Sequence, residues 1–125
     1  PPERERLVSQ AEVLRHGFVV SAEKLRVALY EAALLTAEMF ESKKISEEFF
    51  QSQNEKSCEL YDTISWQVEN IKGQDFNLAS QRDIKLWIKK LQVEIADMNQ
   101  TITAMENGKK FREKVFFSLA VDAKH

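Results

Sequence analysis

The sequence predicts an all-α fold, an elongated up-and-down bundle of three long helices plus a shorter C-terminal helix. Turn residues are scarce, because the 125 residues include only 3 glycines and 2 prolines, and both prolines stand at the N-terminus. Strand-rich folds need turn residues about every ten positions. Apolar residues also recur at alternating intervals of three and four over most of the chain, which is the helical period. The composition, 43% hydrophobic and 30% charged, is ordinary for a charge-rich helical protein.

The first helix is expected from about residue 3 to residue 41. Prolines followed by acidic residues suit the first turn of a helix, where the backbone N–H groups are unpaired. Gly17 is the weak point, because glycine in a helix interior costs about 1 kcal/mol relative to alanine, and the sequence leaves open whether it kinks or breaks the helix. Residues 27–40 carry a second apolar row, which predicts that this helix is central.

The second helix is expected to begin after Ser46, a favourable N-cap followed by two glutamates, and to end near Gly73. Its residues 51–59 are polar. This stretch is expected to be solvated, or to pack only through Gln53 and Ser57.

The third helix has the most regular pattern in the chain. Ser80 and Asp83 resemble a capping box at its start. Seven apolar residues then follow with strict alternation of four and three, as in a coiled-coil seam: Ile84, Ile88, Leu91, Ile95, Met98, Ile102 and Met105. Asn107-Gly108 is expected to end the helix, because continuing the seam would place Lys109 and Arg112 at core positions.

A separate element is therefore expected over residues 110–122. As a helix it places Phe111, Val115 and Leu119 on one side. The alternation of residues 115–122 also fits a strand, but nothing else in the chain resembles a partner strand, and a lone strand cannot pair its backbone. The helix is favoured, and the strand stays open as the alternative.

The chain is expected to form a single domain, since 125 residues suffice for one core and are too few for two. It begins without an initiator Met, at "PPERER", which indicates a domain excised from a longer protein. One cysteine and no recognisable signal peptide or membrane span favour a cytoplasmic location.

The residues that could carry chemistry are few. His16 stands one turn after Glu12, but no second histidine or cysteine follows at ligand spacing. Cys58 lies beside Glu59, and a neighbouring carboxylate disfavours the thiolate. No phosphate-binding glycine motif or nucleophile motif occurs. We therefore expect no enzyme activity, no catalytic or metal site and no cofactor.

Charge is distributed unevenly. Residues 109–125 contain five basic and two acidic residues, a net charge of +3, while the whole chain carries −2 and the rest therefore −5. Such a stretch next to aromatic residues is typical of peripheral membrane or phosphoinositide-binding segments. Its simpler interpretation is a terminal helix docked on the bundle with solvated lysines. The candidate residues for contact with an anionic surface are Lys109, Lys110, Arg112 and Lys114.

The leading functional hypothesis is a non-enzymatic protein–protein interaction domain of a scaffold or adaptor, which binds a partner helix or self-associates as an antiparallel homodimer. The alternative is the peripheral membrane or phosphoinositide-binding module. Nucleic-acid binding is disfavoured, because both tryptophans lie in neutral or acidic helices. The partner surface is expected where apolar residues exceed what one seam buries: Leu34, Phe40, Phe49, Phe50, Phe76, Phe116 and Phe117.

Overall fold

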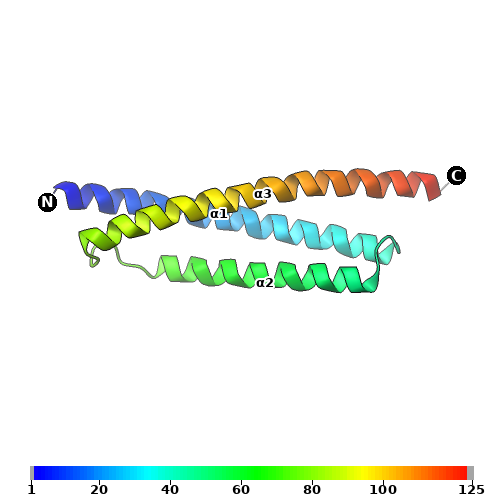
Figure 1. The fold of residues 1–125 in the computed structure, drawn as a ribbon, viewed down its shortest axis with the longest axis horizontal. Helices are drawn as coiled ribbons and strands as arrows, with labels where there is room; N and C mark the ends of the chain where they lie inside the picture. The colour runs from blue at the N-terminus through cyan, green and yellow to red at the C-terminus, as the bar shows by residue number, and fades with distance from the viewer. Residues whose placement is uncertain (1, 124–125) are drawn as a thin grey trace.

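The computed structural model describes the backbone of residues 2–123 and the side chains of residues 2–110. Three long helices make up the chain: α1 (Pro2–Glu41), α2 (Glu47–Lys72) and α3 (Gln81–Ala123). They lie along one elongated molecule, with the N-terminus and the end of α3 at opposite ends (Figure 1). The predicted all-α class is confirmed, since no strand occurs in the described backbone.

Helix α1 is the central helix, as predicted, because it packs against both α2 and α3. Helices α1 and α3 run in the same direction (Figure 1). Gly17 lies opposite Ile95, and Glu31 pairs with Lys109, so both contacts join residues 78 positions apart. The three helices are not equally close to one another, because no described Cα atom of α2 comes within 8 Å of one in α3.

The core follows the predicted seams. Ala11, Phe18, Ala22, Ile84 and Leu91 are all 0% exposed. Helix α2 adds buried residues only near its C-terminal end: Ile64, Val68 and Ile71.

Gly17 neither breaks nor ends α1, which is helical throughout. A Cβ atom at this position would lie 3.6 Å from Cδ1 of Ile95. This is an ordinary packing distance, and the glycine marks a point where α1 and α3 lie close together.

Local signals set the predicted helix starts. The Ser46 hydroxyl accepts a hydrogen bond from the Phe49 N–H, 3.1 Å away, and the Ser80 hydroxyl accepts one from the Asp83 N–H, also at 3.1 Å. Helix α2 ends at Gly73, as predicted. Helix α1 ends without a glycine, and Lys43 adopts the left-handed conformation there with φ of 60°, while the Lys44 N–H donates to the Met39 carbonyl at 2.8 Å.

The predicted stop at Asn107-Gly108 is wrong. Helix α3 continues through Gly108 to Ala123, so the separate C-terminal helix does not exist and the strand alternative is excluded over residues 110–122. The seam does continue to Lys109, but this residue meets a carboxylate: its Nζ lies 2.7 Å from Oε2 of Glu31 on α1. A half-exposed ion pair thus occupies the position where the sequence indicated that a lysine could not be accommodated.

Candidate functional site

The two ends of the bundle are built differently. We call the end formed by the α2–α3 loop, residues 73–80, the sealed end, and the end formed by the α1–α2 loop, residues 42–46, the open end. At the sealed end the loop is tied to α1 by arginine side chains. At the open end α2 lies beside α1 with little burial. Because its helices are less tightly packed, the open end is where we place the candidate site.

Arg15 holds the sealed end together. Its Nη1 donates to the Ile71 carbonyl at 3.0 Å and also to the Gln74 carbonyl, and it pairs with Glu12. Its guanidinium lies 4.4 Å from the ring centroid of Phe76. A cation at the C-terminus of α2 is favourable because the last carbonyls of a helix are unpaired and carry partial negative charge.

Arg4 binds the other half of the same loop. Its Nη2 donates to the carbonyls of Asn77 and Ala79, at 2.7 Å and 2.6 Å. Phe76 points into the core beneath these contacts, only 1% exposed, with its ring edge-on to Trp87. Phe76 was expected on a partner surface, and its burial removes it from any such surface in this conformation.

The open end is sparsely packed. No residue of α2 before Ile64 is buried, although the helix begins at Glu47. Between residues 51 and 59 only Gln53 and Ser57 are half-buried and the other residues are exposed, which agrees with the second of the two alternatives, packing only through these two residues.

One aromatic stack joins the two helices here. The rings of Phe40 and Phe50 lie parallel, with centroids 4.7 Å apart and an angle of 8° between their planes. Both had been assigned to the partner surface, and each already has the other as its neighbour. Leu34 and Phe49 are instead exposed, by 49% and 51%. The side chains of Phe116 and Phe117 lie outside the described residues.

A groove of about 390 Å³ opens between the three helices at this end. We call it the open-end groove. This volume falls within the range of about 300–1,000 Å³ that is usual for binding pockets. Ten residues line it: Ala32, Ala33, Thr36, Phe50, Gln53, Asn54, Ser57, Ala104, Met105 and Gly108.

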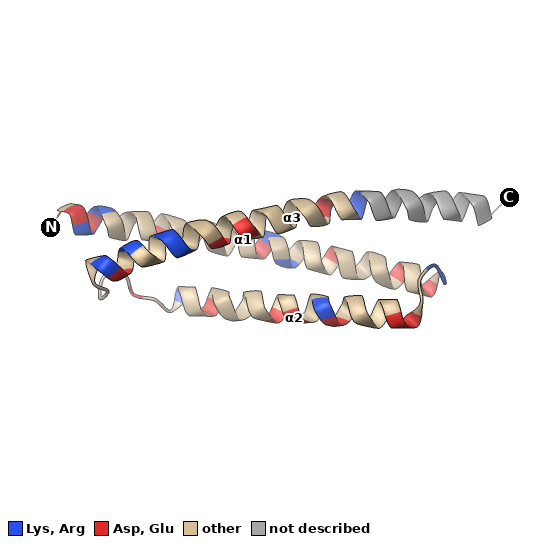
Figure 2. Cartoon of the chain, viewed as in Figure 1, with Lys and Arg blue, Asp and Glu red and all other residues tan. Residues whose placement is uncertain are grey.

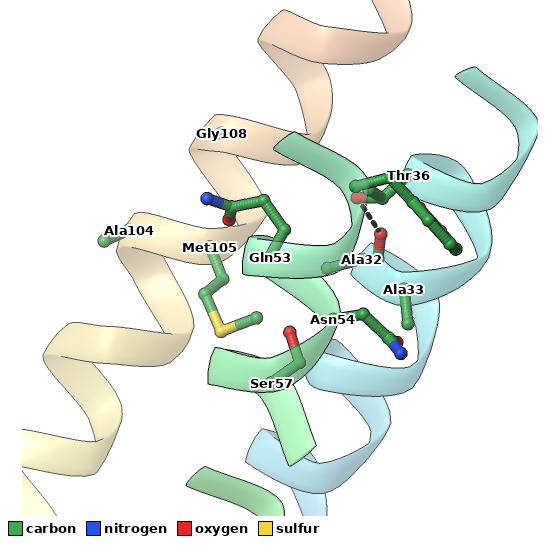
Figure 3. Close-up of a pocket in the computed structure, with 10 residues that line it drawn as sticks. Ala32, Ala33, Thr36, Gln53, Asn54, Ser57, Ala104, Met105 and Gly108 are labelled. Atoms are coloured by element: carbon green, nitrogen blue, oxygen red, sulfur yellow. Dashed lines mark hydrogen bonds between the residues drawn. The ribbon is translucent and has the colours of Figure 1, made fainter. Parts of the chain in front are cut away.

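The walls of the groove come from different helices. Gln53 and Ser57 lie on α2, facing the side chain of Met105, which points from α3 into the space between them (Figure 3). The Thr36 hydroxyl donates to the Ala32 carbonyl at 2.8 Å and so has its hydrogen bond within α1.

The polar residues of the groove are available for hydrogen bonding. The amide side chains of Gln53 and Asn54 make no hydrogen bond to another side chain or backbone group within the described part of the chain. Most other lining residues are small, and small side chains allow a helix to approach closely. The groove therefore offers a shallow apolar floor with two amides at its edge.

Carboxylates outnumber lysines where α1 and α2 meet at the open end. Figure 2 shows acidic residues where α1 ends and α2 begins. Four acidic residues lie within the last turn of α1 and the first turn of α2, against two lysines in the loop between them. The acidic residues are Glu38, Glu41, Glu47 and Glu48, and the lysines are Lys43 and Lys44.

The basic residues proposed for an anionic surface are only partly described. Lys109 is half-buried and paired with Glu31, and Lys110 is exposed. The side chains of Arg112 and Lys114 lie outside the described residues. At least one of the four cations is therefore engaged by α1.

Groups that could support other functions are scattered. Within residues 2–110, no cluster of three or more His, Cys, Asp or Glu side chains could hold a metal ion. Cys58 is exposed on α2. Over the same residues, none of the helices has an apolar stretch that could cross a membrane.

The groove was only partly foreseeable from the sequence. Phe50 had been assigned to a partner surface and Gln53 and Ser57 to packing, whereas Gly108 had been interpreted only as a helix stop and the alanines of the floor had been given no role in binding. Small residues on a helix carry no signal of their own, and only the spacing of the three helices makes them a surface.

Comparisons with protein families, curated proteins and solved structures gave no match to this chain.

Proposed function

We propose that this chain is a non-enzymatic protein–protein interaction domain, of the scaffold or adaptor type, that binds a partner helix in the open-end groove. The observation that supports this proposal is the groove itself, about 390 Å³ between three helices, beside an α2 segment with no buried residue before Ile64. An amphipathic helix in a hydrophobic groove is a recurrent mode of recognition. The small residues of the floor suit the close approach of a second backbone.

The surroundings of the groove define the partner's chemistry. Exposed apolar side chains, Leu34 and Phe49, lie on the helices that form the groove, and four carboxylates against two lysines lie where α1 ends and α2 begins. The partner is therefore a helix with apolar anchors at i, i+4 and i+7 and with lysines or arginines beside them. Complementary charge of this kind accelerates association and selects between partners.

A matched pair of substitutions on α3 tests the proposal. Ala104 lines the groove, whereas Ala96, also exposed on α3, lies outside it. Proteins captured by the tagged wild-type chain are identified and their affinities measured by calorimetry. Ala104→Arg is expected to weaken a groove-bound partner at least about tenfold, equivalent to about 1.4 kcal/mol, while Ala96→Arg leaves its affinity unchanged. A partner that binds all three proteins equally would contradict the groove as the binding site.

Co-sedimentation with vesicles separates this proposal from the membrane alternative. Vesicles of phosphatidylcholine with phosphatidylserine are the probe, with neutral vesicles as the control. An interaction domain that works through the groove stays in the supernatant with both. Sedimentation with the anionic vesicles only, lost in Lys109→Glu/Lys110→Glu, would favour the membrane module instead.

A further inference from the structure

Burial along α2 changes abruptly at Ile64. From this residue on, Ile64, Val68 and Ile71 are at most 2% exposed, at intervals of four and three that place them on one face. One turn earlier, Leu60 is 37% exposed. We call residues 47–63 the α2 arm. The arm has no buried residue and only three that are half-buried.

Two hollows adjoin the contact between the arm and α1. One is the open-end groove. The other, of about 280 Å³, is lined by Leu29, Tyr30 and Ala33 of α1 and by Asn54, Ser57, Cys58, Tyr61 and Asp62 of the arm. Asn54 and Ser57 line both hollows. Little of the arm therefore packs closely on α1.

The arm has few specific bonds to the rest of the molecule. Within residues 2–110, the hydrogen bonds of its side chains stay inside α2, as from Gln51 to Glu47 at 3.3 Å. None of the ion pairs among these residues involves the arm. The stack between Phe40 and Phe50 is therefore the main specific contact that joins the arm to α1.

The remainder of α2 is anchored to α1 by arginines as well as by its buried residues. Nη1 of Arg26 lies 3.5 Å from Oγ of Ser65, and Nη1 of Arg15 donates to the Ile71 carbonyl at 3.0 Å. The two parts of one helix thus differ in how much would be lost if they separated from α1.

Burial decides how firmly a helix stays in place. Most helical stability in proteins comes from the packing of an apolar face, because isolated helices shorter than about 12–15 residues are marginal in water. Segments with few buried contacts open at a lower free energy than the core of the same protein. The arm is such a segment, whereas the part of α2 from Ile64 onward is not.

We propose that the α2 arm opens from α1 as one unit, with Ile64 as the first residue that stays packed, while the sealed end keeps its structure. Opening removes from the open-end groove the four arm residues that line it: Phe50, Gln53, Asn54 and Ser57. The groove is therefore complete only while the arm is closed. A molecule that binds the complete groove shifts the equilibrium toward the closed arm. The opening itself belongs to the free chain and does not depend on the proposed function.

Amide hydrogen exchange, followed by NMR on the 125-residue chain, tests the opening. Residues 51–63 are compared with residues 64–72, because the first four N–H groups of a helix have no partner within it. After correction for intrinsic rates, the arm amides are expected to exchange at least about a hundredfold faster, with similar protection along residues 51–63 and a step at Ile64. Equal protection along the whole of α2 would overturn the proposal.

Small amounts of denaturant distinguish a unit that opens from a helix end that frays. An opening that exposes surface becomes more frequent as denaturant is added, in proportion to the area exposed. The arm amides are expected to respond together, at concentrations below those that unfold the bundle. Exchange that is insensitive to denaturant and accelerates residue by residue toward Glu47 would show fraying alone and rule out the unit.

Phe50→Ala and Phe49→Ala form a matched pair on the arm. The same atoms are removed one residue apart, from a ring stacked on Phe40 and from a ring that is 51% exposed. Phe50→Ala is expected to speed the exchange of residues 51–63 by a further factor of about ten, and Phe49→Ala by no more than about two. Both variants are expected to leave residues 64–72 unchanged. Equal acceleration of residues 64–72 in Phe50→Ala would show that α2 opens as a whole.

The arm and the groove are judged by separate measurements. Exchange is measured on the free chain and needs no partner. An Ala104→Arg comparison that fails removes the groove as the partner site and leaves the opening of the arm in place. Uniform protection of α2 removes the opening of the arm and leaves the groove.

Discussion

Truncation of Phe76 is the sharpest test of the packing at the sealed end. The side chain is 1% exposed although it belongs to a loop, and it contacts the guanidinium of Arg15 at 4.4 Å and the ring of Trp87 with centroids 6.2 Å apart. Removing a buried phenylalanine costs about 3–5 kcal/mol through lost burial and the cavity left behind. Phe76→Ala is therefore expected to lower the free energy of unfolding by about 4 kcal/mol.

This free energy translates into a large thermal shift. At about 2.1 cal/mol/K per residue, the 125 residues give an unfolding entropy of about 0.26 kcal/mol/K, so 4 kcal/mol lowers Tm by about 15 °C. Thermal and urea unfolding followed by circular dichroism at 222 nm measure both quantities.

Phe49→Ala is the matched control, because the same atoms are removed from a ring that is 51% exposed. Its expected cost is below about 1 kcal/mol, a shift of less than about 4 °C. If the free energies of unfolding of the two variants differ by less than about 1 kcal/mol, the Phe76 side chain does not seal the core.

Four further predictions follow from single side chains. Arg15→Lys is expected to cost about 1–2 kcal/mol in urea unfolding, because an ammonium group cannot bond two carbonyls and stack on Phe76 as the guanidinium does; Arg6→Lys, on a side chain 66% exposed, is its control and is expected to change little. Gly108→Ala is expected to stabilise the protein by about 1 kcal/mol, because Gly108 is helical and an added Cβ would meet nothing within 4 Å; a destabilised variant would indicate a turn. Lys43→Gly is expected to raise the free energy of unfolding by about 1 kcal/mol, because Lys43 is held at φ of 60°, where a Cβ atom is unfavourable. The hydrogen bond from Arg6 holds the pKa of the Glu3 carboxyl below its ordinary value of 4.5. In Arg6→Gln this pKa is therefore expected to rise, which an NMR titration of Glu3 measures. The stability that the pair contributes is present above the ordinary pKa and is lost as the pH falls through the lowered one.

Much of the fold could be predicted because its signals are local. The N-caps at Ser46 and Ser80, the end of α2 at Gly73 and the seam of α3 each depend on residues within a few positions of one another. Interactions between residues so close in the chain do not depend on tertiary contacts, so the sequence alone is enough to predict them.

The errors arose where distant residues decide the outcome. Asn107-Gly108 is a sound local stop signal, but a glycine costs a helix only about 1 kcal/mol, and Glu31 accepts Lys109 from 78 residues away. Phe76 looked like a loop aromatic because its contacts with Arg15 and Trp87 belong to other helices. The groove was invisible for the same reason, since alanines and a glycine become a binding surface only when three helices place them together.

The parallel alignment of α1 and α3 also has a mechanical consequence. The N-terminus lies at one end of the molecule and the end of α3 at the other (Figure 1), so tension between the two ends would pull α1 and α3 past each other along their common axis. Every layer of the seam would then bear the load at once, in shear, whereas two antiparallel helices pulled from one end separate one layer at a time. A pulling experiment on this domain should therefore record a single abrupt rupture at high force. The buried apolar residues that α1 and α3 share, which include Leu7 on α1 and Ile102 on α3, would resist that force.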